Sequence, residues 1–313
     1  MTLEQRMVLE ELKANDSHPE RGEIKLVKDF LGNEYFERTT SVSFEIWHLN
    51  GQLKKRGTYK DGKLQGLFLE WYENGQLERR VRYKNGLPNG SFEDWWENGK
   101  LARRGNYKDG KLDGLREEWY QNGQLRLQET YIMGLREGLS EKWYSNGQLR
   151  VRAYWGEVGA KGLFETWYKN GQLLSKENYK NGKRNGLREE WYDNGQLFRR
   201  ENYKEGKLDG LVEQWYPNGQ LCGRSHFKNG LRESFEEVWD KKGNFVYKAN
   251  YKSGKREGAQ VCSMEGSGAV VETFKNGSYQ GSVSFPTVDE ALASLEQKKK
   301  ITLKPKKKGG VKL

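Results

Sequence analysis

Residues 71–90 read WYENGQLERRVRYKNGLPNG, and close copies of this stretch recur along the chain every 24 residues. The period is clearest in nine tryptophans that share one register. These are Trp47, Trp71, Trp95, Trp119, Trp143, Trp167, Trp191, Trp215 and Trp239. A repeat of this length is one supersecondary unit that cannot bury a hydrophobic face alone, so it must stack on its neighbours. The sequence therefore predicts a repeat array instead of independent globular domains.

A second aromatic column and a turn column run at the same period. The aromatic column holds Tyr35, Tyr59, Tyr83, Tyr107, Tyr131, Trp155, Tyr179, Tyr203, Phe227 and Tyr251. The turn column consists of glycines that each follow an asparagine: Gly51, Gly75, Gly99, Gly123, Gly147, Gly171, Gly195 and Gly219. Asn-Gly is the strongest short-range hairpin signal, because a type I′ turn needs positive φ at both central residues. We therefore predict a strand, a two-residue Asn-Gly turn, a second strand and a longer glycine-containing connection in each repeat.

A two-residue turn fixes which residues face each other across a hairpin. Glu93 is then opposite Arg104, and the same count gives six further pairs of opposite charge. These are Glu45 with Arg56, Glu141 with Arg152, Glu165 with Lys176, Glu189 with Arg200, Glu213 with Arg224 and Glu237 with Lys248. At the two remaining positions Glu117 meets Gln128 and Leu69 meets Arg80. Cross-strand charge pairs favour one register over a slipped one, so this ladder supports the predicted pairing.

The predicted fold class is all-β: an elongated single-sheet meander of nine to ten stacked hairpin repeats with short terminal capping helices. The ends of the chain depart from the repeat pattern. Thr2 and Gln5 form a capping-box signal before an apolar helical pattern, and Thr287 and Glu290 form another. The predicted divisions are an N-terminal cap with a short helix (1–34), the repeat array (35–258), a degenerate capping hairpin (259–286), a short helix (287–300) and a disordered lysine-rich tail (301–313).

The composition separates a nearly neutral body from a basic tail. Only 34% of the residues are hydrophobic and the mean hydropathy is −1.03, which fits a thin sheet better than a deep core. Of the net charge of +11, eight positive charges come from the last sixteen residues, which contain no acid. These lysines are Lys298, Lys299, Lys300, Lys304, Lys306, Lys307, Lys308 and Lys312. Such a segment is expected to stay extended and to bind nucleic acid or anionic lipid without sequence preference.

No group of residues indicates catalysis, a metal or a cofactor. His18, His48 and His226 share no metal-like spacing, and the two cysteines are far apart and give no disulfide framework. The glutamates recur in nearly every repeat with a basic partner, which favours structural pairing over a catalytic pair of carboxylates. The aromatic columns favour packing between repeats over binding of sugars, proline-rich peptides or bases. The chain is therefore expected not to be an enzyme, to carry no metal and no cofactor, and to take no small-molecule substrate.

The motif Trp-Tyr-x-Asn-Gly-Gln-Leu, followed by Tyr-Lys-x-Gly-Lys-x-x-Gly, resembles the MORN repeat in its Asn-Gly-Gln-Leu variant. Good copies are residues 71–77 with 83–90 and residues 191–197 with 203–210. Proteins with this variant include bacterial antitoxin-like proteins of the YwqK type and multi-copy proteins of giant viruses such as the Marseillevirus group. The lysine tail and the lack of a signal segment resemble the second group more closely. The resemblance implies a protein scaffold and, in some relatives, association with membranes.

Three functions follow from these observations as alternatives. The first is a non-catalytic scaffold that binds another protein through one face of the sheet, and the giant-virus resemblance implies that it belongs to a large DNA virus. The second is an antitoxin-like protein that neutralises a partner toxin. The third is a peripheral adaptor that reaches a membrane or nucleic acid through the basic tail. No apolar run approaches the roughly 20 residues of a membrane span, and the N-terminus lacks an apolar signal core, so a cytoplasmic or virion location is expected.

Overall fold

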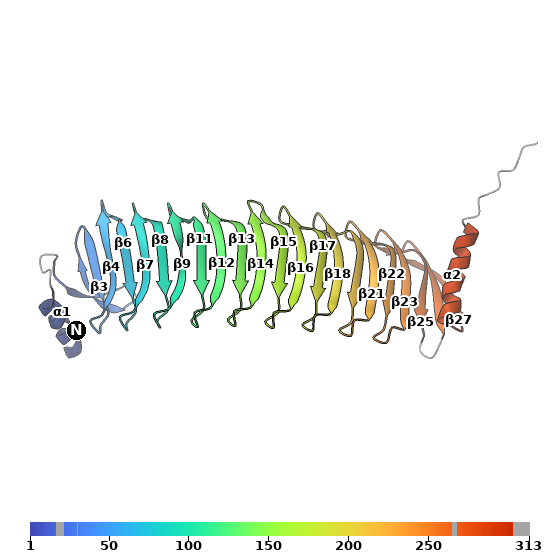
Figure 1. Ribbon diagram of the computed structural model, residues 1–313, viewed down its shortest axis with the longest axis horizontal. Helices are drawn as coiled ribbons and strands as arrows, with labels where there is room; N and C mark the ends of the chain where they lie inside the picture. Colours follow the sequence, from blue (N-terminus) through green and yellow to red (C-terminus); the bar gives the residue numbers. More distant parts are fainter. Residues whose placement is uncertain (17–21, 30, 265–267, 303–313) are drawn as a thin grey trace, which may run out of the picture. The chain divides into compact units, whose positions relative to one another are not determined.

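The computed structural model describes residues 1–16, 22–29, 31–264 and 268–302, with side chains described as far as Glu296. The chain divides into two units, Met1–Gly159 and Ala160–Leu313, and each is described by itself. Strands dominate both units, and one helix belongs to each (Figure 1). The predicted all-β class with terminal helices is confirmed.

The first unit contains α1 (Leu3–Ala14) and strands β1 to β14. The strand bounds are β1 (Lys25–Lys28), β2 (Glu34–Thr39), β3 (Ser43–Trp47), β4 (Leu53–Lys60), β5 (Lys63–Leu64), β6 (Gly66–Trp71), β7 (Leu77–Lys84), β8 (Leu87–Trp95), β9 (Leu101–Lys108), β10 (Lys111–Leu112), β11 (Gly114–Trp119), β12 (Leu125–Ile132), β13 (Leu135–Trp143) and β14 (Leu149–Gly156).

The second unit contains strands β15 to β27 and α2 (Val288–Thr302). The strand bounds are β15 (Gly159–Trp167), β16 (Leu173–Lys180), β17 (Lys183–Trp191), β18 (Leu197–Lys204), β19 (Lys207–Leu208), β20 (Gly210–Trp215), β21 (Leu221–Lys228), β22 (Leu231–Trp239), β23 (Phe245–Lys252), β24 (Lys255–Arg256), β25 (Gly258–Ser263), β26 (Ala269–Lys275) and β27 (Ser278–Phe285).

Within each unit the strands pair antiparallel with their neighbours in the chain, which is the topology of a meander. In the first unit β6 pairs with β7, β7 with β8 and β8 with β9. The register also agrees with the sequence prediction: Glu93 lies opposite Arg104 and Glu189 opposite Arg200. The other seven predicted cross-strand partners are confirmed in the same way.

The prediction of a type I′ turn at Asn-Gly after each tryptophan is wrong. In the turn after Trp71, only Gly75 has positive φ, at +82°, and Asn74 does not. The Gly75 N–H donates to the Tyr72 carbonyl at 3.0 Å, and the Tyr72 N–H donates to the Gln76 carbonyl at 2.9 Å. This is a longer turn that ends in a glycine bulge, and the strand register shifts beside Trp71.

The asparagine of this turn does not adopt positive φ; its role is in the hydrogen bonds of its side chain. Asn74 Oδ1 accepts from the Gln76 N–H at 2.9 Å within its own turn. Asn74 Nδ2 donates to the carbonyl of Glu97 in the next turn at 3.0 Å. Asn194 makes the equivalent pair of bonds in the second unit. Each Asn side chain therefore closes one turn and ties it to the following repeat.

The two-residue type I′ turns occur instead at the opposite margin, where the sequence predicted a longer connection. Asn85 and Gly86 have φ of +53° and +83° and join Lys84 to Leu87, which face each other as a pair. The equivalent turns include Asp109-Gly110 in the first unit and Asn229-Gly230 in the second. The two kinds of turn therefore exchange places relative to the prediction, while the length of the repeat and its register are unchanged.

A further glycine column lies inside the strands that follow these turns, and one repeat lacks it. Its glycines are Gly66, Gly90, Gly114, Gly138, Gly162, Gly186, Gly210 and Gly258, all with positive φ. Ser234 occupies this position in β22 with φ of +72°. A side chain in the left-handed region costs about 1–2 kcal/mol.

We therefore expect Ser234→Gly to stabilise the protein by about 0.5–1 kcal/mol, because relief of this strain exceeds the entropy that glycine gains on unfolding. Chemical denaturation with a two-state fit is the measurement. Ser91→Gly is the matched control: Ser91 lies in β8 without positive φ, so this change should destabilise. Equal effects of the two changes would show that backbone strain at Ser234 is negligible.

The sheet of each unit has two faces, and the helix of that unit packs on the face that carries its register tryptophans. We call the face that carries the register tryptophans the tryptophan face, and the face that carries the Tyr59–Tyr251 column the tyrosine face. In the first unit, Leu9 of α1 packs with Ile24, Phe36 and Trp47. In the second unit, α2 contributes Ala291 to a cluster with Val261, Ala269 and Val271.

The terminal segments contain more strands than the sequence predicted. Within residues 1–34, β1 pairs with β2, which the cap prediction did not include. Within residues 259–286, β25, β26 and β27 form three consecutive antiparallel strands. The helix after them extends to Thr302, two residues beyond the predicted end. Residues 303–313, and the side chains of Lys298, Lys299 and Lys300, lie outside what the structure describes.

Candidate interaction surface

On the tryptophan face, arginines stack over the register tryptophans of the adjacent strand. The Arg80 guanidinium lies 5.5 Å from the centre of the Trp95 ring, and Arg104 lies 5.3 Å from Trp119. In the second unit Arg200 and Arg224 lie 5.8 and 5.6 Å from Trp215 and Trp239. Cation–π contacts of this kind contribute about 0.5–1 kcal/mol each at exposed sites. The tryptophans therefore serve to join neighbouring strands.

Arginines of this column also hold the glutamate ladder that the sequence predicted. Arg152 Nε donates to Glu141 Oε1 at 2.8 Å, and Arg200 Nε donates to Glu189 Oε1 at 3.0 Å. The ladder continues between hairpins, since Arg104 Nε also donates to Glu117 in the next strand at 2.6 Å. Each of these glutamates therefore has a basic partner on a neighbouring strand, as the register predicted.

We expect Glu189→Arg to destabilise more than Glu189→Arg combined with Arg200→Glu. The first change opposes two cations across the hairpin, whereas the exchange restores an ion pair. The coupling should be about 0–1 kcal/mol, because the Arg200 side chain is 43% exposed. A double-mutant cycle by chemical denaturation measures it. A cycle between Glu189 and Arg80, which lies in the other unit, is the control and should give zero coupling.

Beside the ladder, the tryptophan face presents a column of leucines to solvent, one in most repeats. We call this column the leucine stripe. It contains Leu67, Leu115 and Leu139 in the first unit and Leu163, Leu187 and Leu211 in the second. Leu67, Leu115, Leu139 and Leu187 are 38–46% exposed. An apolar row that repeats at one register position differs from scattered exposed leucines, and it is the candidate interaction surface of this chain.

The chain itself shows what kind of segment this face accepts. In the first unit the apolar side chains of α1, Val8, Leu9 and Leu12, pack on the first register tryptophan, Trp47. Trp47 is 9% exposed, and the other register tryptophans in the described chain are less buried. In the second unit Leu292 and Leu295 of α2 pack on the same face. The tryptophan face therefore accepts apolar sides of helices in both units.

The tyrosine face, by contrast, buries its central column under its own side chains. In the first three repeats this column is small and apolar, and it lies under aromatic rings. The Phe92 ring lies 4.8 Å from the Tyr107 ring and fills the space beside Gly105. A Cβ at Gly105 would lie 2.7 Å from the Phe92 ring. The glycine is therefore required by the size of its cross-strand partner.

Further along, the same column becomes ionic. Glu201 is 2% exposed, and it accepts hydrogen bonds from Arg188 at 2.8 Å and from the Tyr203 hydroxyl at 3.0 Å. Burial disfavours the charge on Arg188, but its pairs with Glu201 and Glu190 outweigh this and raise its pKa above the usual value. Glu129 and Glu177 are buried in the same way beside arginines. These carboxylates are buried and ion-paired with arginines, which is a structural role.

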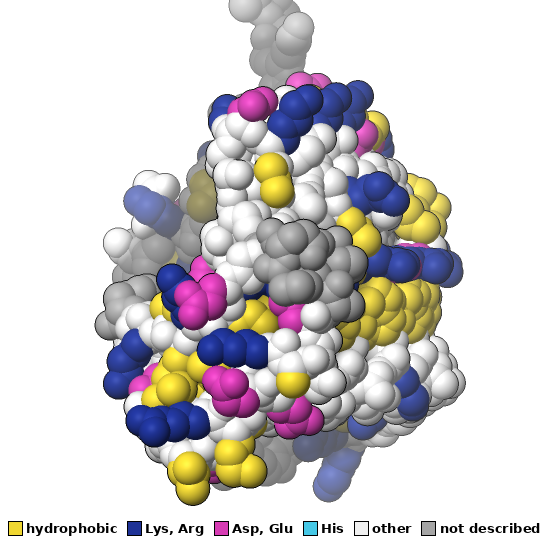
Figure 2. Space-filling view, turned by 90° about the vertical axis from the view of Figure 1, so that its left-hand side faces the viewer, with side chains coloured by type: hydrophobic (Ala, Val, Ile, Leu, Met, Phe, Trp, Pro, Cys, Tyr) yellow, Lys and Arg dark blue, Asp and Glu magenta, His cyan; other side chains and the backbone are white. Residues whose placement is uncertain are grey.

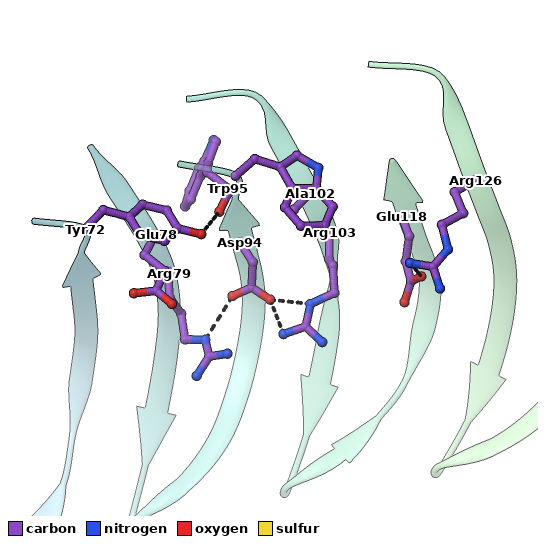
Figure 3. Close-up of a pocket in the computed structure, with 10 residues that line it drawn as sticks. Tyr72, Glu78, Arg79, Asp94, Trp95, Ala102, Arg103, Glu118 and Arg126 are labelled. Carbon is purple, nitrogen blue, oxygen red and sulfur yellow. Dashed lines mark hydrogen bonds and ion pairs between the residues drawn. The ribbon is translucent and has the colours of Figure 1, made fainter. Parts of the chain in front are cut away.

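One repeat of the first unit leaves a hollow of about 410 Å³ on the tyrosine face (Figure 3). Ala102 is the cause, because the equivalent positions in the neighbouring repeats hold Glu78 and Arg126, which form opposite walls. At its floor Asp94 bridges Arg79, at 2.9 Å, and Arg103, at 2.5 Å. The lining carries three acids and three arginines, so it has no net charge that would select an ion.

The tryptophans outside the register have packing partners of their own. Trp96, which lines the hollow, replaces the tyrosine of other repeats, and its Nε1 donates to the Trp119 carbonyl at 3.3 Å. Tyr72 makes the same bond from its hydroxyl to the Trp95 carbonyl at 2.8 Å (Figure 3). Trp155 lies under the Arg136 guanidinium at 4.4 Å. The Trp96 and Tyr72 bonds join one repeat to the next, whereas the Arg136–Trp155 contact lies within one hairpin.

The described surface does not concentrate positive charge at the N-terminal end. Figure 2 shows Lys and Arg there mixed with Asp, Glu and hydrophobic side chains. The predicted polyanion-binding lysines are outside the residues whose side chains are described, so no geometry can be assigned to them. None of the helices in the described ranges is long and apolar enough to cross a lipid bilayer.

Sequence reasoning missed the leucine stripe. Its signal is present in the sequence, because a leucine follows the in-strand glycine in most repeats, for example Gly114-Leu115 and Gly186-Leu187. What the sequence alone does not give is the exposure of these side chains, because it depends on whether a second layer covers this face of the sheet.

Comparison with solved structures gives only distant matches. The chain from the "Crystal Structure of TcdB2-TccC3-Cdc42" is 12% identical with a TM-score of 0.18, and the match covers 80% of this chain and 17% of that one. Two related structures, of TcdB2-TccC3-TEV and of TcdB2-TccC3 without its hypervariable C-terminal region, are 11% identical with TM-scores of 0.19, and each match covers 80% of this chain and 15% of theirs. At these scores they support no argument about the fold. No curated protein matches the sequence.

The family comparison is decisive. The model of the MORN repeat variant matches eight segments: residues 43–61, 64–85, 88–109, 112–133, 136–155, 161–181, 184–205 and 208–229. Together they cover more than half of the chain, and each segment contains one register tryptophan. Repeat length, register and family model agree, and the chain belongs to the MORN repeat variant family.

Proposed function

We propose that this protein is a non-catalytic scaffold that binds a protein partner on its tryptophan face. The observation that supports this most directly is the leucine stripe, an apolar row at one register position in both units. The ion ladder beside it supplies charges of both signs at fixed intervals. Charged groups around an apolar centre fix the orientation and register of a partner more than they add affinity.

The proposed partner segment is an amphipathic helix. Both helices of this chain pack their apolar sides on the tryptophan face, so the chemistry of that contact is already present in the fold. Leucines at equivalent positions of successive repeats are two strands apart, which is about 9.6 Å. One heptad of an α-helix rises about 10.5 Å. A helix that crosses the strands would therefore meet a leucine at each heptad over two or three repeats.

The test is capture of partners with cross-linking mass spectrometry, using paired variants. Leu115→Asp with Leu139→Asp, and Leu187→Asp with Leu211→Asp, should lose the partner that the wild-type protein captures. Leu135→Asp and Leu231→Asp are controls: these leucines follow the turns at the margin and are 61% and 52% exposed, so their replacement should retain it. Retention by the stripe variants, or loss with the controls alone, would contradict the proposal.

For the basic tail, we propose that it carries the affinity of the protein for polyanions. Eight lysines without an acid in sixteen residues release condensed counterions when they bind a phosphate backbone or an anionic surface. Truncation after Gln297 should abolish binding to heparin and to DNA at low salt, and should leave capture of the protein partner unchanged. If the truncated protein still shifts DNA with the same salt dependence, the sheet itself is the polyanion site.

A further inference from the structure

The last strand of the second unit, β27, has an unprotected edge. Among the described residues it pairs only with β26. Its sequence, Ser-Tyr-Gln-Gly-Ser-Val-Ser-Phe over residues 278–285, contains no charged residue, in a chain of which 32% is charged. Tyr279 and Val283 are 56% and 60% exposed. Proteins protect edge strands with charges, proline or short length, because a free edge is a template for another strand.

The edge strand of the first unit shows the contrast. β1 is four residues long and has a lysine at each end, Lys25 and Lys28. Its Leu26 packs against the cluster under α1 and is only partly exposed. β1 is therefore protected by its short length and by its charges, whereas β27 is eight residues long and has no charged residue. A register shift between Thr273 and Phe274 of β26, where Gln280 of β27 has no paired residue, leaves Gly281–Phe285 in regular pairing with β26.

We propose that two copies of this chain associate through β27 in an antiparallel pair about a twofold axis. An isologous contact of this kind is self-complementary: the same strand meets itself. With the axis at Val283, the two Val283 side chains face each other, and Ser282 of one copy pairs with Ser284 of the other. This association goes beyond the proposed scaffold function and does not depend on it.

The apolar cluster on the tryptophan face favours a second copy of this chain, instead of an unrelated strand, as the partner of β27. Val283 lies opposite Val271, whose side chain is buried in the cluster with Ala291 of α2. Val283 thus extends that cluster to the edge, where the described chain does not cover it. A twofold axis perpendicular to the sheet keeps both α2 helices on the same face, on either side of the two Val283 residues. The new pair of strands then completes one apolar cluster from two halves.

The charges of α2 also suit this arrangement. The helix has Asp289 and Glu290 in its first turn, and its sequence ends in lysines. The twofold axis sets the two helices antiparallel, which keeps their acidic first turns away from each other. A parallel arrangement would oppose like charges. Because the main contact is one short strand, we expect a dimer in the micromolar range of affinity.

Sedimentation velocity of the full chain over a concentration series tests the association. The wild-type protein should pass from monomer to dimer. Val283→Lys should weaken the dimer at least about 100-fold, because two like charges then face each other at the axis. Val246→Lys is the matched control: Val246 is 38% exposed in the interior strand β23, and its replacement should leave the dimer unchanged. Circular dichroism should show both variants folded.

A cysteine variant tests the register. In a background with Cys222→Ser and Cys262→Ser, Val283→Cys should form an intermolecular disulfide under mild oxidation, because opposed residues of antiparallel strands lie within disulfide distance. Val246→Cys in the same background should not. A wild-type protein that stays monomeric at all concentrations overturns the proposal, as does a dimer that Val283→Lys leaves intact. Open-ended oligomers would also overturn it, since a twofold contact closes at two copies.

Discussion

Glu201→Val is expected to destabilise the protein by about 3–5 kcal/mol, because it leaves Arg188 with a buried, partly unpaired charge. The Glu201 side chain is 3% exposed and that of Arg188 is 16% exposed. Arg188 would keep Glu190 and a longer pair with Glu177 at 3.4 Å, but the partner opposite it across the hairpin would be gone. Urea denaturation followed by tryptophan fluorescence measures the loss.

Another repeat of the chain suggests a double variant that should compensate for the loss of Glu201. Phe68 and Val81 occupy the equivalent cross-strand positions in the first unit, where they form an apolar pair. Arg188→Phe with Glu201→Val transplants that pair into the second unit. Replacing a buried ion pair by apolar residues of suitable size is often neutral or stabilising, so the double variant should regain most of the lost stability. A double variant as unstable as Glu201→Val would show that Glu177 and Glu190 depend on Arg188 more than the contacts indicate.

Removal of one whole repeat, residues 162–185, is expected to leave a folded protein with slightly lower stability. The residues after the deletion, from Gly186, are equivalent to those removed, from Gly162, so β15 continues into the second half of β17. Each repeat contacts its neighbours, and the stability of such arrays is approximately a sum of repeat and interface terms. Solubility, circular dichroism and a cooperative unfolding transition are the measurements.

Removal of residues 168–179, which form one turn and most of β16, is the matched control. It takes away a single strand, so the following strand would run parallel to its neighbour where the ladder requires an antiparallel one. The hydrogen bonds and the side-chain register of the next repeats would then be lost. We expect an aggregated or unfolded product. Equal tolerance of both deletions would contradict the meander.

The period and the cross-strand register were predictable because they depend on counting alone. Trp71 and Trp95 fix the period, and the opposition of Glu93 and Arg104 fixes the register whichever turn joins the strands. The turn types were not predictable from dipeptides, since Asn74-Gly75 and Asn85-Gly86 are the same dipeptide in two different turns. What separates them is the context: the Asn74 amide reaches the next repeat, a contact that no local rule contains.

The interaction surface was less accessible from the sequence. A leucine such as Leu115 is a core residue in most proteins, and only a single-layered sheet leaves it exposed. The reverse holds for Glu201: glutamate is expected at the surface, but this carboxylate is buried. In both cases burial depends on which neighbours the stacking supplies. The strand β1 was missed because Lys25-Leu-Val-Lys28 is too short for a periodic signal.

The hydrogen bonds between successive turns affect which positions of the repeat can vary among related sequences. At one margin the Asn74 amide and the Tyr72 hydroxyl bond to backbone carbonyls of the next repeat, and at the other the Gly86 N–H donates to the Leu64 carbonyl at 2.9 Å. Backbone acceptors are the same whatever the residue. The distance between repeats is therefore set at the margins, and paired positions on the faces between them can change together without altering it. That freedom explains how one period accommodates both an aromatic core and an ionic core, and it predicts that variation among related sequences will be greatest on the faces and least at the turns.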